Sequence, residues 1–142
     1  MREPVERLLR DAGWVPGRAQ SIDEDLDFLE ASGFPATDPV KSFLREFSGL
    51  VVRFLRNERE DEIWLDLRRA ARWADPEWVA EYMRRVGVPL VPIGYANHEH
   101  LMLLETQDGR FFGAFDDFLG SLGSSPDEMI ENLVTQQIQP VE

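Results

Sequence analysis

Runs of aliphatic, β-branched and aromatic residues near the middle of the chain predict three consecutive β-strands, at residues 90–96, 100–106 and 110–115. Asp108 and Gly109 lie between the second and third strands, and an Asp-Gly pair suits the positive φ angles of a two-residue hairpin turn. All four residues from 101 to 104 are apolar, so both faces of the middle strand carry hydrophobic side chains. We therefore expect this strand to be covered on both sides.

Apolar residues at helical spacing predict five helices that flank these strands. Glycine follows four of them, as is common at helix ends, and prolines lie in first turns. Ser21 and Glu24 have the spacing of a capping box, which predicts a side-chain cap at the start of the second helix. A short helical turn is expected at residues 68–74. The five helices lie between residues 4 and 13, 21 and 33, 38 and 49, 75 and 87, and 125 and 134.

Two further strands, at residues 50–56 and 62–67, are predicted to form a second hairpin around the charged residues between them. Glycine and serine dominate residues 120–125, which predicts a loop leading into the last helix. The tail from Gln136 to residue 142 carries no strong pattern, and we expect it to be frayed. The mixed order of elements predicts an α+β fold, a largely antiparallel sheet of about five strands with helices packed around it. We expect a single domain whose packed part spans residues 5–134.

Length, charge and composition limit the number of domains, the kind of partner and the cellular location that we expect. The chain has 142 residues, enough for one domain, and a formal net charge of −12. Such a charge repels nucleic acids and anionic membranes and attracts basic partners. The absence of cysteine excludes disulfides, thiolate zinc sites and a cysteine nucleophile. The charged N-terminal stretch does not resemble a signal peptide, and no stretch approaches the roughly 18 apolar residues of a membrane span, so we expect a soluble cytoplasmic protein.

Acidic residues concentrate between residues 21 and 38, where the chain carries six carboxylates and no lysine or arginine. Two interpretations remain open: the helix dipole favours carboxylates early in a helix, and the same carboxylates could contact a basic partner. A second acidic pair follows the last of the three central strands, where an acidic turn also explains it. The candidate partner-binding residues are Asp23, Glu24, Asp25, Asp27, Asp116 and Asp117.

Motif spacing predicts no catalytic or metal-binding constellation. His98 and His100 flank Glu99, but a third metal ligand would have to come from elsewhere, and a polar connection between strands explains these residues better. We therefore predict no catalytic residue, no metal and no cofactor. The tryptophans are expected to pack in the core or, for the first of them, to anchor a loop: Trp64, Trp73, Trp78 and Trp14.

Two motifs are moderately specific, Ala12-Gly13-Trp14 followed by Pro16-Gly17-Arg18, and Phe43-Leu44 followed by Glu46-Phe47-Ser48-Gly49-Leu50. Together with weaker motifs in the expected order over residues 5–134, they resemble the third bacterial subgroup of the SUKH superfamily of immunity proteins. Ser48 departs from the pattern, since the family usually has a second glycine there. The motif residues look structural, with glycines ending helices and aromatic rings packing: Trp14, Gly17, Arg18, Gly33, Phe43, Phe47, Gly49 and Gly94.

The resemblance implies an α+β fold and a role in polymorphic toxin systems, in which such proteins bind and neutralise a cognate toxin in the cytoplasm. That toxin is commonly a nuclease or deaminase, so the expected partner is a protein toxin with a basic surface. The resemblance implies no catalytic residue. A non-catalytic regulatory or scaffold module is the alternative, and a small hydrolase using Asp116 or His98 is a third hypothesis that lacks a catalytic constellation. The sequence leaves the oligomeric state open.

Overall fold

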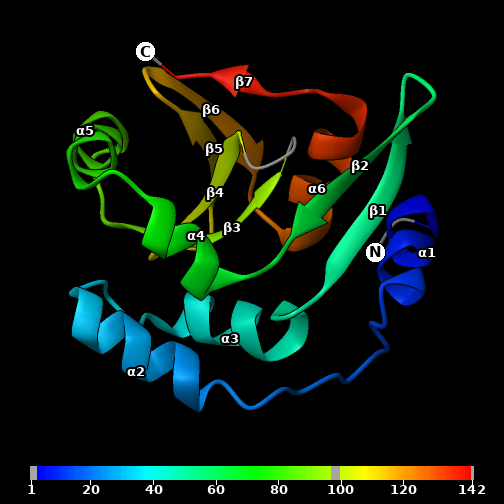
Figure 1. Ribbon diagram of the computed structural model, residues 1–142, viewed down its shortest axis with the longest axis horizontal. Coiled ribbons are helices and arrows are strands. Elements are labelled where there is room, and N and C mark those ends of the chain that lie inside the picture. Colours follow the sequence, from blue (N-terminus) through cyan, green and yellow to red (C-terminus); the bar gives the residue numbers. More distant parts are fainter. Residues whose placement is uncertain (1–2, 97–99, 142) are drawn as a thin grey trace.

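One antiparallel sheet of seven strands, paired in chain order, organises residues 3–96 and 100–141, which the computed structural model describes (Figure 1). The α+β class is confirmed, with seven strands in place of about five. The strands are β1 (Val51–Arg56), β2 (Arg59–Trp64), β3 (Leu90–Ala96), β4 (Leu101–Thr106), β5 (Phe111–Phe115), β6 (Phe118–Gly123) and β7 (Gln139–Pro140).

The helices of the described residues follow the predicted order, and the helical turn expected near residues 68–74 is a helix of its own. They are α1 (Glu3–Asp11), α2 (Asp23–Ser32), α3 (Asp38–Phe47), α4 (Leu67–Trp73), α5 (Pro76–Val86) and α6 (Pro126–Thr135). Asp75 and Ser125 cap the starts of α5 and α6 through their side chains, which satisfies backbone N–H groups that have no partner within the helix. The predicted capping box at Ser21 is wrong, because Ile22 occupies the position before α2 and no side chain caps it.

Strand β4 is buried on both faces, as predicted. Leu101 and Leu103 belong to the large core, which also contains side chains from α1, α2, α3 and α6. Leu104 points the other way, into a smaller cluster with Tyr82 of α5. In Figure 1, α5 accordingly lies on the side of the sheet away from α6. The sheet is therefore the middle layer of the fold.

Gly94 marks the place where the β1–β2 hairpin joins the central strands. Only Ile63 and Trp64 of β2 pair with β3, so the two strands meet over a short length. A Cβ atom placed on Gly94 would lie 2.2 Å from the carbonyl oxygen of Trp64. Only glycine allows the β2 backbone to approach this closely.

Two expectations about the C-terminal part of the chain were wrong. Residues 120–123, predicted to lie in a loop, belong to β6. The tail, expected to be frayed, contains β7, which pairs with β6 through Gly120 and Ser121. Glycine has low intrinsic preference for strands, which explains the loop prediction. In the structure a Cβ on Gly120 would lie 2.2 Å from the side chain of Ile138, so the returning tail requires the small residue.

The turn of the first hairpin is also shorter than expected. Asn57 and Glu58 form it with positive φ angles of 51° and 65°, which is the geometry of a two-residue turn. The charged residues 59–61, predicted to lie in the connection, are instead the start of β2. The run of charged residues therefore did not indicate where β2 begins.

Glu105 places a carboxyl group inside the large core. It lies on β4 opposite Val91 and Phe111 and is only 2% exposed. Its Oε1 has no hydrogen-bond partner among the described residues. Burial penalises the charged form and raises the pKa of Glu105 from 4.5 to about 8. The side chain is therefore neutral at neutral pH in the folded protein.

We predict that Glu105 makes the protein less stable as pH rises from about 5 to about 8. In that window the unfolded chain loses a proton that the folded protein keeps, so rising pH favours unfolding. Each unit of the pKa difference corresponds to about 1.4 kcal/mol, which makes the expected loss several kcal/mol. The measurement is the free energy of unfolding in urea at a series of pH values, for the wild type and Glu105→Gln.

The glutamine variant cannot ionise, so its stability should fall less steeply over the same range. The comparison of slopes is independent of any constant cost of burying the amide. Parallel curves for the two proteins would show that Glu105 does not retain its proton on folding.

Candidate partner-binding site

The family-like motif residues near the N-terminus contact one another. The Nε1–H of Trp14 donates to Glu46 Oε2 at 2.9 Å, and the indole is buried. Arg18 donates to the backbone carbonyls of Glu46 and Ser48 at 2.6 and 2.8 Å, which satisfies carbonyl groups at the end of α3. The loop after α1 is therefore fastened to the C-terminal end of α3.

The remaining motif residues lie at turns and in the core. Gly17, Gly33 and Gly49 have φ angles of 81°, 78° and 87°, a backbone region that favours glycine. Phe43 and Phe47 are buried and their ring centroids lie 5.2 Å apart. The aromatic rings pack inside the fold, and the glycines occupy exposed turns.

The acidic stretch of α2 divides into one buried and several exposed carboxylates. Asp25 is buried. It accepts a hydrogen bond from Ser48 Oγ at 3.1 Å and forms a salt bridge with Arg68 Nε at 3.2 Å. Glu24 is exposed and pairs with the same arginine at 2.8 Å. Asp25 thus ties α2 to α4 and to the end of α3, and it cannot contact a partner directly. The exposed carboxylates of α2 are Asp23, Glu24 and Asp27, together with Glu30 near the end of the helix.

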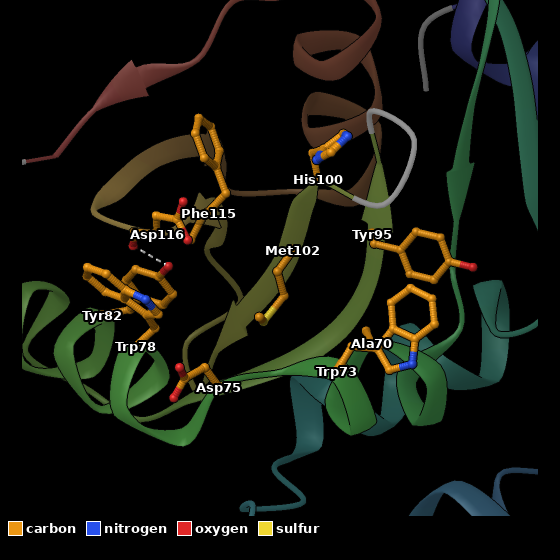
Figure 2. A pocket seen from close by; sticks show the side chains of 11 residues that line it. Ala70, Trp73, Asp75, Trp78, Tyr82, Tyr95, His100, Met102, Phe115 and Asp116 are labelled. Atoms are coloured by element: carbon orange, nitrogen blue, oxygen red, sulfur yellow. Dashed lines mark hydrogen bonds between the residues drawn. The ribbon is translucent and has the colours of Figure 1, made fainter.

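An aromatic hollow of about 180 Å³ opens between α4, α5 and strands β3 to β5 (Figure 2). Its floor includes Met102 and Ala114, and its walls are rings from separate elements. In Figure 2, Trp78 and Tyr82 lie on one side of Met102, and Trp73 and Tyr95 lie on the other. We call this site the aromatic hollow; its rings are Trp73, Tyr95, Trp78, Tyr82 and Phe115.

The second predicted acidic patch lies at this hollow. Asp116 and Asp117 form the exposed turn between β5 and β6, and Asp116 lines the hollow. The hydroxyl of Tyr82 donates to the backbone carbonyl of Asp116 at 2.5 Å, which holds the turn against α5 (Figure 2). Arg85 donates to the carbonyl of Asp117 at 2.8 Å. The carboxylates themselves remain exposed beside the rings.

Carboxylates lie close to the hydroxyl of Tyr82 in the hollow. Burial raises the pKa of Tyr82 to about 12, and the nearby carboxylates of Asp116, Asp117 and Asp75 add to the rise, while Arg85 opposes it. Among the described residues, none of those that line the hollow is lysine or arginine. The lining therefore combines aromatic faces with the carboxylates of Asp75 and Asp116, while the guanidinium group of Arg69 lies against two of the rings.

The sequence pattern predicted that Trp73 packs in the core, and this prediction is wrong. It is 62% exposed at the end of α4, and Trp78 is only partly buried. The close spacing of Trp73, Trp78 and Tyr82 was the sequence signal that could have indicated an aromatic site. The fold brings these rings to one hollow together with Tyr95 of β3. Trp14, by contrast, anchors its loop as predicted.

The histidine pair forms no recognisable centre among the described residues. His98 lies outside them, and His100 is exposed at one end of the aromatic hollow (Figure 2). Residues 3–96 and 100–141 contain no cluster of three or more His, Asp or Glu side chains that could hold a metal ion. In the same part of the chain, no helix has the length and apolar character needed to cross a membrane.

The fold and these surfaces describe a small protein with an exposed aromatic and acidic face. Residues 1–136 match the family model for SUKH-3 immunity proteins. The chain therefore belongs to the SUKH-3 immunity protein family. Searches among curated proteins and among solved structures found no significant match.

We predict that Asp25 and Asp27 contribute very differently to stability although they are neighbours on α2. Asp25→Ala should lower the free energy of unfolding by about 1–3 kcal/mol, because Ser48 and Arg68 lose a buried acceptor. Asp27→Ala, at an exposed position, should change it by less than about 0.5 kcal/mol. Urea unfolding of the two variants makes the comparison. Equal effects would contradict the assignment of Asp25 as an internal tie.

Proposed function

We propose that this protein is an immunity protein of a bacterial polymorphic toxin system and neutralises a cognate toxin by binding it. The observation that carries the proposal is the match of residues 1–136 to the SUKH-3 immunity protein family. The toxin is a protein with a basic surface that acts on nucleic acid, and the immunity protein meets it in the cytoplasm. It acts by occlusion and performs no reaction itself.

Charge supports this choice of partner. A toxin that acts on nucleic acid needs a basic binding surface, and this chain carries a net charge of −12. Opposite charges on the two partners increase the rate at which they meet, by about 10- to 1,000-fold in favourable cases. Asp23, Glu24 and Asp27 on α2 and the acidic turn at Asp116 and Asp117 are exposed and available for such an encounter.

Co-expression tests the proposal directly. Cells that produce the toxin encoded beside this chain should die without it and survive with it, and the two proteins should co-purify. Survival without a complex would contradict binding as the mechanism. Death despite abundant folded protein would contradict the immunity function.

We predict that reversing the charge of the exposed carboxylates of α2 slows association with the toxin. The variant carries lysine at positions 23, 24 and 27 and keeps Asp25, which the fold needs. Its association rate constant at low salt should fall by about tenfold, and the rate should depend less steeply on ionic strength. Stopped-flow or surface-plasmon measurements at several salt concentrations provide the values.

A matched variant with lysine at Glu3, Asp11 and Glu58 has the same net charge but alters exposed positions on α1 and the first hairpin. If it slows association as much as the α2 variant, the effect comes from net charge and α2 is not the surface of encounter.

A further inference from the structure

The aromatic hollow is lined by none of the acidic residues of α2, and two of its rings, Trp73 and Phe115, are largely exposed. We propose that the hollow receives an arginine side chain of the toxin and is the anchor point of the complex. This inference rests on the proposed function and names the chemistry of one contact. Four features of the structure support it.

The first feature is the arrangement of the rings. Trp78 and Tyr82 stack with their centroids 6.1 Å apart and an interplanar angle of 16°, so they form one side wall of the hollow. Trp73 and Tyr95 lie on the opposite side of Met102 (Figure 2). A cation that enters between the two sides meets aromatic rings around it, and aromatic faces attract cations.

The second feature is that two of these rings already contact a guanidinium group of the protein itself. The Cζ atom of Arg69 lies 5.1 Å from the ring centroid of Trp73 and 5.5 Å from that of Tyr95. These distances are within the range of cation–π interaction. These rings are therefore held in positions that suit a guanidinium group at one edge of the hollow.

The third feature is charge. Asp75 and Asp116 line the hollow, and Asp117 lies beside Asp116 in the exposed β5–β6 turn. A neutral apolar anchor would gain nothing from these carboxylates and would leave them partly desolvated. A cation pairs with them, and the guanidinium fork suits a carboxylate better than an ammonium group does.

The fourth feature is size and exposure. The hollow measures about 180 Å³, below the range of about 300–1,000 Å³ of sites for small-molecule ligands, so it fits a single side chain. Trp73 and Phe115 are 62% and 48% exposed at its rim, where a partner would bury them. Interfaces concentrate their binding energy in such pockets, and tryptophan, tyrosine and arginine are the residues that most often carry it.

A small probe tests the site without the toxin. Nα-acetyl-arginine amide should shift the indole signals of Trp73 and Trp78 in a saturable way by NMR. Nα-acetyl-citrulline amide, which has the same shape without the charge, should not. Equal shifts with both probes, or no saturable shift with arginine, would overturn the assignment. Tighter binding of the lysine or norleucine analogue would also overturn it, in favour of an ammonium or an apolar anchor.

Variants connect the probe to the complex. Trp73→Ala removes an exposed ring, and Asp75→Asn/Asp116→Asn removes two charges while keeping a helix-capping side chain and a residue that tolerates the φ of 47° at position 116. Both should abolish the saturable shifts and raise the Kd for the toxin by about tenfold or more, chiefly through faster dissociation. The matched controls are Leu55→Ala, an exposed apolar residue of β1, and Asp11→Asn on α1. They should change the Kd by less than about threefold.

The outcomes separate the two proposals. If the toxin binds the wild type but binds Trp73→Ala and the double asparagine variant with unchanged Kd, the anchor assignment is wrong and the proposed function stands. If the wild-type protein neither binds the toxin nor protects cells, the proposed function is wrong, whatever the arginine probe shows.

Discussion

Burial of both faces of strand β4 is the constraint on which the arrangement of the other elements depends. Leu101 and Leu103 face the large core, and Leu104 faces the cluster under α5. Each fully buried leucine stabilises the fold by about 1.5–3 kcal/mol, but only if water is excluded from both faces of the sheet. The chain achieves this with α1, α2, α3 and α6 on one side and α5 on the other. Helices must therefore lie on both sides of a single sheet.

The two faces are covered unequally, and the aromatic hollow results from this difference. The large core draws on side chains from α1, α2, α3, α4 and α6, whereas the second cluster takes its one fully buried helical side chain, Tyr82, from α5. Beside α5 the sheet surface around Met102 is covered by the rings of Trp73, Trp78 and Phe115. These rings shield the sheet while remaining partly exposed, so the same side chains can protect the strands and contact a partner. A rigid sheet beneath them fixes their positions, which lowers the entropy cost of binding.

Some arginines connect elements of the fold. Arg18 donates to carbonyl groups at the end of α3, and Arg68 pairs with Asp25 and Glu24 between α2 and α4. Arg85 holds the turn at Asp117. Ser48, where the family pattern usually has glycine, completes the same set of ties through its hydrogen bond to Asp25. The arginines thus stabilise connections between elements, while most carboxylates of α2 and of the β5–β6 turn remain exposed to a partner.

The helices, the central strands and the two-sided coverage of β4 could be predicted from the sequence, because periodicity is a local signal. The two-residue turn predicted at Asp108 and Gly109 is instead a longer connection over residues 107–110, in which Gly109 has a positive φ of 83°. The net charge and the motifs that indicate the family could also be identified from the sequence. The strand position of Gly120, the internal contacts of Asp25 and the burial of Glu105 depend on long-range packing. Each of these depends on what lies opposite the residue: Ile138, Arg68 and the packed face of β4. The aromatic hollow also depends on long-range packing, because its rings come from α4, α5, β3 and β5. No single segment of the sequence carries a pattern that predicts their meeting.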